Sequence, residues 1–586
     1  MAKVDINTLK LELREVQNSN PVWTLDNAFV HWFLRAFLVA DDEIAARSVT
    51  GVSHDKGVDA ILVDDETNKV FILQGKCHLG AKPPNENRND VLGFARLARV
   101  VRGSSAEYAA YARKIDPIVA DRLGKARKRL FGKGYDLQLY YVSTGNCASP
   151  LKDEAESEIS QANGYCDISV LDRKEVLTLL TDYLGGAAPP VPSLDLHVDS
   201  RGIVGSDGMI QRYDQKTGIE SWILTMTGKD VGFLYKNAGD RLFARNIRGF
   251  LGDTAINEGM KKTLQQEAEH FWYFNNGITV VCNTARKTAE KGQVILRVSN
   301  PQIINGQQTT RTLDEHPQSK ASVLVRVISI PRDADHDEVG FEKLVSNIVA
   351  ATNWQNAILP SDLRSNDQRQ VALERDFAKL HYKYIRKRQT KREARRMLGA
   401  QHYFWIKKEE LAQSVAGCEL DPQDVRSGKE GLFKAPFYDE IFDNRPVHQY
   451  LSSYWLARVV KRAASGYPDR SYAKWLVLNT LWARVGNEMK KKHPATAFRE
   501  QCERGRWNHH LSKAVEQLYL AALAFYRSRR GAGATAVDVS NFFYRAKLIT
   551  GFEVFWRSRA NRRREVVAKE LRKFAADLSL ISDGQK

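Results

Sequence analysis

Two short apolar runs on either side of a polar turn constrain the N-terminal part of this chain more than any other feature. The first run covers residues 57–61 and the second covers residues 72–76. Residues 64–68 (Asp-Asp-Glu-Thr-Asn) lie between them and are typical of a tight turn. Apolar runs that flank such a turn predict a β-hairpin. We therefore expect two paired strands between residues 57 and 76.

Side chains of different chemistry gather at the open end of this predicted hairpin. Strand residues two apart point to the same face, so Gln74 and Lys76 share a face and Gly75 points away. If the strands pair as the turn indicates, Asp59 lies near that face. A carboxylate, an amide oxygen and an ammonium can together hold Mg²⁺, or Mn²⁺ in its place, and orient water against a phosphodiester. The plain alternative is a polar hairpin with a solvated lysine.

The hairpin resembles the core of PD-(D/E)xK nucleases, in the Mrr-like version that has Gln in place of the second acid. Residues 53–59 (Ser-His-Asp-Lys-Gly-Val-Asp) are similar to the approach to the catalytic Asp in that group. The resemblance implies that Asp59 and Gln74 bind the metal and that Lys76 orients the attacking water. Because Gln supplies a neutral oxygen, the implied metal affinity is lower than with two carboxylates. Many such nucleases add an acid from the preceding helix, and Glu43 is the candidate here.

Hydrophobic periodicity extends the hairpin into a larger domain. Helices are predicted over residues 27–46, 90–101, 105–130 and 173–184, with another starting at Ser149-Pro150, and strands over residues 137–142 and 168–171. This order of elements suits a three-layer α/β domain of restriction-endonuclease-like fold over residues 1–184.

Composition divides the rest of the 586-residue chain. A Gly/Pro-rich stretch indicates a linker, after which strands and helices mix before the pattern becomes almost wholly helical. The predicted regions are a linker over residues 185–195, an α+β core over residues 196–335, a helical part over residues 336–450 and a basic helical C-terminal domain over residues 451–586.

Two Asn-Gly turns stand out in the predicted α+β core, one within residues 271–281 and one within residues 300–310. A strand that leads through a glycine turn into a helix exposes free N–H groups and the positive end of the helix dipole, which favours anions. The neighbouring polar groups could bind a nucleotide, although turn and capping chemistry would explain them equally. The candidate residues are Asn275, Asn276, Asn305, Gly306, Gln307, Gln308 and Thr309.

The same two turns resemble the signature of the AIPR family, named for abortive-infection phage resistance. Residues 275–279 read N-N-G-I-T, and residues 303–310 read I-I-N-G-Q-Q-T-T. Residues 245–249, 353–356 and 432–442 are similar to other segments of that family. The resemblance covers about residues 230 to 445 and implies a role in defence against phage.

The charge of the chain favours a polyanionic partner. The sequence has 88 Lys and Arg residues against 70 Asp and Glu residues, a net charge of +18. Such an excess attracts nucleic acid through counterion release. Basic residues cluster at 122–133, 386–396 and 557–573, where the alternative is a solvated helix face. The cluster that follows Tyr384 is the best candidate for phosphate contacts, through Arg386, Lys387, Arg388 and Arg392.

The sequence also predicts where such a protein resides. The six cysteines are scattered and form no C-x-x-C, so neither a zinc site nor a disulfide framework is expected. The N-terminus lacks an apolar signal region, and no apolar run approaches the length of about eighteen residues that crosses a bilayer. We expect a cytoplasmic protein without a membrane partner.

These observations predict an anti-phage defence nuclease that hydrolyses phosphodiester bonds with Mg²⁺, with DNA favoured over RNA. The helical C-terminal part could add basic contacts and a homodimer surface. One alternative is a nucleic-acid or nucleotide sensor of phage defence whose nuclease-like domain is inactive. Another is a nucleotide-dependent regulator in which the middle region carries the main activity.

Overall fold

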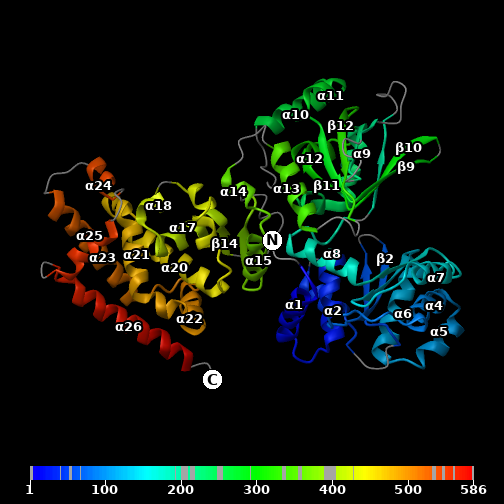
Figure 1. Cartoon of the computed structure of the whole chain (residues 1–586), viewed down its shortest axis with the longest axis horizontal. Coiled ribbons are helices and arrows are strands. Elements are labelled where there is room, and N and C mark those ends of the chain that lie inside the picture. Colours follow the sequence, from blue (N-terminus) through cyan, green and yellow to red (C-terminus); the bar gives the residue numbers. More distant parts are fainter. Residues whose placement is uncertain are drawn as a thin grey trace. The chain divides into compact units, whose positions relative to one another are not determined.

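The computed structural model contains two compact units, which Figure 1 shows coloured along the sequence. Unit 1 comprises residues 1–246 and 255–352, and unit 2 comprises residues 247–254 and 353–586. The residues that the structure describes are 4–39, 41–51, 56–65, 68–191, 193–199, 209–211, 218–246, 255–290, 292–332, 338–353, 359–388, 404–426, 428–530, 536–543, 548–558 and 561–583.

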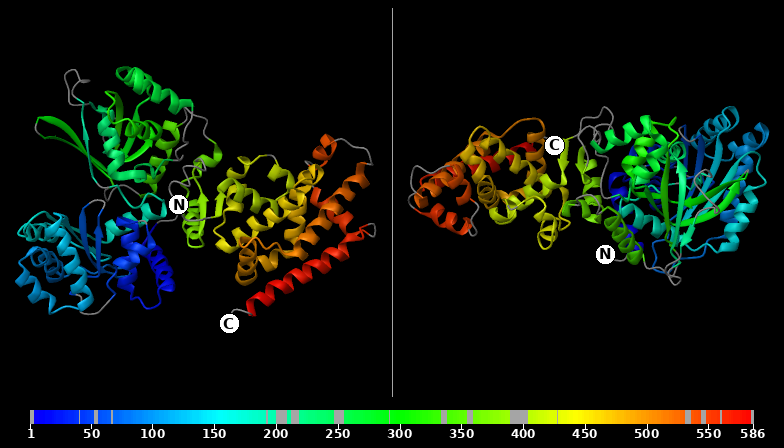
Figure 2. Two further views of the ribbon diagram at one scale, coloured as in Figure 1. Left: turned by 180° about the vertical axis from the view of Figure 1, so that it is seen from behind. Right: turned by 90° about the horizontal axis from the view of Figure 1, so that it is seen from above.

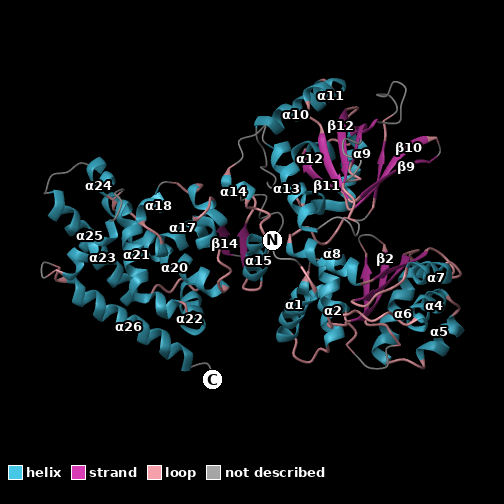
Figure 3. Ribbon diagram, viewed as in Figure 1, coloured by secondary structure: helices cyan, strands magenta, loops and turns pink. Residues whose placement is uncertain are grey.

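A four-stranded mixed sheet forms the centre of the N-terminal part of unit 1 (Figure 3). Its strand order is β1-β2-β3-β4, with β1 antiparallel to β2 and the other neighbours parallel. The predicted hairpin is present, and its register pairs Ala60 with Leu73. The strands are β1 (Ala60–Asp64), β2 (Lys69–Lys76), β3 (Asp136–Ser143) and β4 (Cys166–Leu171).

Helices pack on both faces of this sheet, because successive strand side chains enter two different hydrophobic cores. Val70 and Ile72 of β2 lie in one core, on what we call the α4 face. Phe71 and Leu73 lie in the other core, on the α2 face. The α4 face carries α4 (Arg88–Arg102), α5 (Ser105–Ala112), α6 (Pro117–Gly132) and α7 (Ser149–Ile159); the α2 face carries α1 (Ile6–Ser19), α2 (Leu25–Phe33), α3 (Asp42–Ser48) and α8 (Arg173–Leu184).

The structure divides two helices that the sequence predicted as continuous. The helix predicted over residues 27–46 becomes α2, a π-helical turn (Leu34–Leu38) and α3. The helix predicted over residues 105–130 ends at Ala112, and α6 starts afresh at Pro117. Proline has no N–H to donate, so it suits the first turn of a helix and not its interior.

The second part of unit 1 is an α+β arrangement with two further sheets. The five-stranded sheet has the order β11-β8-β12-β7-β6, and the three-stranded sheet has the order β5-β10-β9. Only β8 and β12 pair in parallel among these described strands. The strands are β5 (Leu194–His197), β6 (Met209–Gln211), β7 (Glu220–Thr227), β8 (Ile278–Cys282), β9 (Thr284–Glu290), β10 (Gln293–Ser299), β11 (Gln302–Asn305) and β12 (Ser322–Ser329).

Helices and short helical turns connect these strands and complete one hydrophobic core with them. They are α9 (Gly228–Ala238), the 3₁₀ turn Gly239–Phe243, α10 (Ala255–Gln266), the 3₁₀ turn Ala268–His270, α11 (Phe271–Phe274) and α12 (Gln307–Glu315). The helix α13 (Glu338–Asn353) follows β12 in the sequence.

Unit 2 is mostly helical, and both views in Figure 2 show its helices. It also contains a short parallel pair of strands, β13 (Tyr382–Ile385) and β14 (Phe404–Lys407), in a region that the sequence predicted as helical. No described helix of the chain is long and apolar enough to cross a bilayer. The helices are α14 (Pro360–Leu363), α15 (Gln368–Ala378), α17 (Lys408–Glu419), α18 (Pro422–Arg426), α19 (Phe437–Ile441), α20 (Val447–Ala464), α21 (Pro468–Met489), α22 (Lys492–Glu503), α23 (His509–Arg530), α24 (Ala536–Phe542), α25 (Leu548–Arg557) and α26 (Arg563–Asp583).

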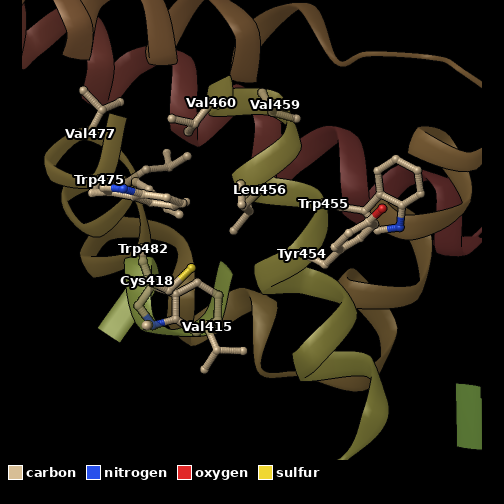
Figure 4. Packing of buried hydrophobic residues seen from close by; sticks show 14 of the residues in the cluster. Val415, Cys418, Tyr454, Trp455, Leu456, Val459, Val460, Trp475, Val477 and Trp482 are labelled. Carbon is tan, nitrogen blue, oxygen red and sulfur yellow. The ribbon is translucent and has the colours of Figure 1, made fainter. Parts of the chain in front are cut away.

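One hydrophobic core runs through unit 2 and contains most of its tryptophans (Figure 4). Trp455, Trp475 and Trp482 are all buried in this core. These rings are therefore packing residues of the core. The core is continuous across residue 450, which lies inside α20, so the predicted boundary between residues 450 and 451 does not separate two cores.

A buried ion-pair cluster joins α8 to the second part of unit 1. Asp182 on α8 accepts hydrogen bonds from Arg245 at 2.7 Å and from Arg332 at 2.6 and 2.8 Å. Burial raises the pKa of Asp182, but the charges and hydrogen bonds of Arg332 and Arg245 outweigh burial and hold the pKa below its ordinary value. The three charges therefore stabilise unit 1 as a set.

Replacing this carboxylate should destabilise unit 1. We expect Asp182→Asn to cost about 3–5 kcal/mol, because it removes the negative charge that two buried guanidinium groups share. Thermal unfolding measures the loss. The control is Asp195→Asn, since Asp195 pairs with Arg297 at a site where the arginine side chain is 57% exposed. An exposed pair should contribute less than about 1 kcal/mol.

The same cluster predicts how the difference in stability between wild type and Asp182→Asn depends on pH. The pKa of Asp182 in the folded state is lower than the ordinary value of 3.8. Stabilisation by its carboxylate is therefore present above the unfolded-state pKa and is lost as the pH falls through the folded-state pKa. The midpoints of wild type and Asp182→Asn should converge below about pH 4. A difference between the two thermal midpoints that stays constant at acid pH would contradict this explanation.

Close packing between β2 and α2 predicts a second stability effect. A Cβ atom on Gly75 would lie 2.4 Å from Val30 Cγ2, which is shorter than the contacts that Cβ atoms make in proteins. We expect Gly75→Ala to destabilise unit 1 by about 1–3 kcal/mol through overpacking. Gly93→Ala on α4 is the control, since a Cβ there meets no atom within 4 Å. It should stabilise α4 by about 0.5–1 kcal/mol. Equal thermal midpoints for the two variants would contradict the packing argument.

Candidate active site

Gln74 and Lys76 lie at the C-terminal end of β2 and share the α4 face, as the sequence predicted. Gly75 between them points to the α2 face, where Val30 and Phe29 lie next to it. The alternation that places Val70 and Ile72 in the α4-face core continues to Gln74 and Lys76. The amide and the ammonium therefore project from the same side of the sheet.

Asp59 lies immediately before β1 and is bound to the end of β2. Its backbone N–H donates to Leu73 O at 2.9 Å, and its Oδ2 accepts a hydrogen bond from Gly75 N–H at 2.7 Å. The carboxylate is therefore hydrogen-bonded to the backbone of Gly75, the residue between Gln74 and Lys76. The predicted juxtaposition of Asp59 with the open end of the hairpin is present.

The amide of Gln74 is enclosed by the chain that leads into β1. Gln74 is only 8% exposed. A Cβ atom on Gly57 would lie 2.6 Å from Gln74 Nε2, so only glycine allows the chain to approach the amide this closely. Gly57 also has a φ of +82°, which L side chains rarely adopt. The glycine in this run therefore has a structural role beside the amide.

Glu43, the predicted additional acid, lies on the solvent side of α3. Its side chain is 79% exposed, and its carboxylate pairs with Arg47 at 3.0 Å. Ala45 and Ser48 form the buried side of the same helix. In this conformation the structure brings Asp59, Gln74 and Lys76 together at the end of β2, and it places Glu43 at the surface of α3.

A buried carboxylate that sequence reasoning missed lies on the α4 face. Glu86 precedes α4, and its side chain is only 4% exposed. It accepts hydrogen bonds from Tyr141 Oη at 2.6 Å and from the hydroxyl of Ser143. Burial raises the pKa of Tyr141 well above its usual range, and the hydrogen bond to Glu86 adds to the shift. Glu86 also pairs with His78 Nε2 at 3.2 Å.

The strand register places this cluster next to the predicted site. Gln74 pairs with Tyr141, and Lys76 pairs with Ser143, across the parallel β2–β3 ladder. Register partners point to the same face, so Glu86 lies over the α4 face one strand away from Lys76. The strand predicted over residues 137–142 contains Tyr141 but ends before Ser143, and nothing in the sequence linked either residue to Glu86.

The two Asn-Gly turns of the second part of unit 1 pack against each other. Asn275 accepts from Gly277 N–H at 2.9 Å and donates to Thr309 Oγ1 at 3.1 Å. Gly306 begins α12 with a φ of +98°, and a Cβ atom there would lie 2.9 Å from Ile278. The close approach of the two turns therefore requires glycine at this position.

Most of the other candidate groups in these turns also contact protein atoms. Asn305 donates to Thr352 O at 2.7 Å, and Gln308 accepts from Asn257 at 2.9 Å. Gln307 is buried like Thr309, while Asn276 is exposed. These contacts favour the alternative in which turn and capping chemistry explains the motif. Nucleotide binding stays a prediction.

The basic cluster after Tyr384 is only partly available to a ligand. Arg386 is buried and donates to Glu374 at 2.6 Å and to Asn366 at 2.8 Å. Its guanidinium is bound inside unit 2 and is not presented to a phosphate, contrary to the prediction. Arg388 pairs with Asp362 at 3.2 Å, and Lys387 is half-buried. Arg392 lies outside the described residues.

The donors at the end of β2 fit a magnesium ion in kind. Mg²⁺ is held in proteins by one or two carboxylates, with water and substrate phosphates as further ligands. Asp59 provides a carboxylate and Gln74 an amide oxygen at the same strand end. Among the described residues, no group of three or more His, Cys, Asp or Glu side chains forms a metal site. A site here would therefore depend on water and substrate oxygens.

Among the comparisons with known proteins, one family model matches the later part of the chain. No curated protein and no solved structure gives a significant match. Residues 243–529 match the family model described as AIPR protein, and this range includes both Asn-Gly turns. The match supports the AIPR resemblance that those turns predicted, and it covers about half of the chain.

Proposed function

We propose that the α/β part of unit 1 hydrolyses phosphodiester bonds and that the chain acts as a nuclease in defence against phage. The observation that carries this proposal is the hydrogen bond of 2.7 Å from Gly75 N–H to Asp59 Oδ2. It holds an acid beside Gln74 and Lys76, at the end of one strand. A carboxylate, an amide oxygen and an ammonium at one position suit metal-assisted attack on a phosphate.

Each side chain has a distinct task in this proposal. Asp59 and Gln74 would hold Mg²⁺, which supplies positive charge next to the phosphate when it is bound. Lys76 orients the attacking water and stabilises the negative charge that develops on the phosphate oxygens. Since Gln74 is neutral, metal binding should be weaker than at a site with two carboxylates.

The substrate class follows from charge and from the family. A net charge of +18 favours a nucleic acid over a neutral or cationic substrate. Attraction to phosphate does not distinguish DNA from RNA, because both have the same charged phosphate groups. We take DNA as the substrate. The match of residues 243–529 to the AIPR model suggests a role in abortive infection or phage defence.

One observation favours a second function, that of a sensor with an inactive nuclease-like part. Gln74 is 8% exposed and its amide lies against Gly57, so its oxygen has little room to move toward an ion. In that case the α/β part would bind nucleic acid without cleaving it.

Cleavage of DNA distinguishes the two functions. We expect wild-type protein to nick or cut plasmid and phage DNA with Mg²⁺ or Mn²⁺, and to lose this activity with EDTA. Lys76→Ala should lower the rate by about 10²–10³-fold, as removal of one charge-stabilising group does at other active sites. Gel electrophoresis of time courses gives the rates.

Lys69→Ala is the matched control, because Lys69 is at the opposite end of the same strand. Its rate should equal that of wild type. Equal cleavage by wild type and Lys76→Ala would rule out the assigned role of Lys76. Binding of DNA without cleavage, with either metal, would support the sensor.

A further inference from the structure

The loop after β2 holds His78 in a defined position on the α4 face. His78 N–H donates to Thr144 Oγ1, and His78 O accepts from the same hydroxyl at 3.0 Å. Arg173 Nη2 donates to His78 O at 2.9 Å. The same guanidinium also binds Thr144 O at 2.6 Å, so it connects the chain after β2 with the chain after β3. Both backbone groups of His78 are therefore bonded.

The imidazole of His78 combines access to solvent with a buried partner. Its side chain is 37% exposed, whereas that of Glu86 is 4% exposed. A carboxylate can only accept, so Nε2 carries the proton in this pair and Nδ1 is the basic nitrogen. Glu86 is in turn held by Tyr141 and Ser143. A carboxylate that is itself held by two hydroxyls fixes the tautomer and the ring of a histidine.

The pair lies at the same edge of the sheet as the proposed site. Ser143, which binds Glu86, is the register partner of Lys76. The backbone N–H of Thr144 donates to Lys76 O at 3.0 Å, so the two strand ends remain joined where His78 follows. The carboxyl ends of adjacent parallel strands form the usual binding crevice of α/β sheets.

We propose that His78 is the general base of the hydrolysis and that Glu86 is its positioning residue. This inference rests on the proposed nuclease function and adds a catalytic residue to it. An oriented imidazole next to a phosphate-binding lysine can accept a proton at neutral pH, which an ammonium cannot do.

The proton-transfer step balances with groups that are present. The oxygen of water bonds to phosphorus while the bond from phosphorus to the leaving oxygen breaks. One proton of the water moves to Nδ1 of His78, and the leaving oxygen takes a proton from solvent. Glu86, which accepts from Nε2, stabilises the imidazolium that forms. The imidazolium then releases its proton to solvent.

Several ionisable groups lie around His78. Glu86 contacts the ring, Arg173 binds the His78 carbonyl, and Lys76 lies two residues before it. Tyr141 contacts the far side of Glu86 and stays neutral, because burial and then its hydrogen bond raise its pKa.

The test compares His78→Gln with wild type in the metal-dependent cleavage of plasmid DNA, using the full chain. We expect kcat to fall by about 10²–10⁴-fold, as loss of a general base does elsewhere, with KM and DNA affinity unchanged. The fall in rate on the acid side of the pH profile should disappear. Added imidazole should partly restore cleavage by His78→Gly.

The positioning role of Glu86 has its own readout. Glu86→Gln should keep part of the activity, with kcat lowered and KM unchanged, because a neutral amide still accepts from Nε2 but no longer stabilises the imidazolium that forms. Thermal unfolding checks that this buried substitution is tolerated. Ser143→Ala, which removes one of the hydroxyls on Glu86, should lower kcat by a smaller amount and also leave KM unchanged.

His270→Gln is the matched control, because His270 pairs with Glu267 at 3.3 Å in the same unit and is away from β2. It should cleave like wild type. If Lys76→Ala abolishes cleavage while His78→Gln keeps the rate and pH profile of wild type, the inference is overturned and the nuclease proposal stands. If wild type does not cleave, the nuclease proposal fails, and the role of His78 fails with it.

Discussion

The candidate site depends on the hydrogen bond between Gly75 N–H and the carboxylate of Asp59. This bond joins the chain before β1 to the end of β2, so both strands of the hairpin contribute to one position. The residue that donates it, Gly75, packs against Val30 without a side chain between them. A larger residue would separate β2 from α2 and would move the donor away from the acid. The geometry of the site is thus tied to the packing of the opposite face of the sheet.

Alternation along β2 gives one strand two functions at once. Residues that point to the α2 face and to the α4 face complete separate cores, and the last two residues on the α4 face are polar. Parallel pairing with β3 then brings Ser143 and Tyr141 beside them, and Glu86 binds to both. Polar groups that are far apart in the sequence therefore meet at the end of a sheet whose body is apolar.

The part of unit 1 that matches the AIPR model shows how a sequence motif can reflect packing. Gly306 and Gly277 allow two turns to approach closely, and Asn275 links them by hydrogen bonds. The buried set around Asp182 joins this part to α8. These contacts explain why Asn, Gly and Thr stand at these positions without requiring a ligand.

Local patterns in the sequence determined the hairpin, the strands near residues 137–142 and 168–171, and the helix over residues 173–184. They also determined that Gln74 and Lys76 point to the same face of their strand. Each of these follows from turn residues and from the spacing of apolar side chains, which act over a few residues. The break before Pro117 and the pair β13–β14 were missed, because the apolar pattern continues across them. Only the tertiary structure decided that Arg386 is buried and that Glu86 holds His78 beside Lys76, because these contacts depend on which strands become neighbours.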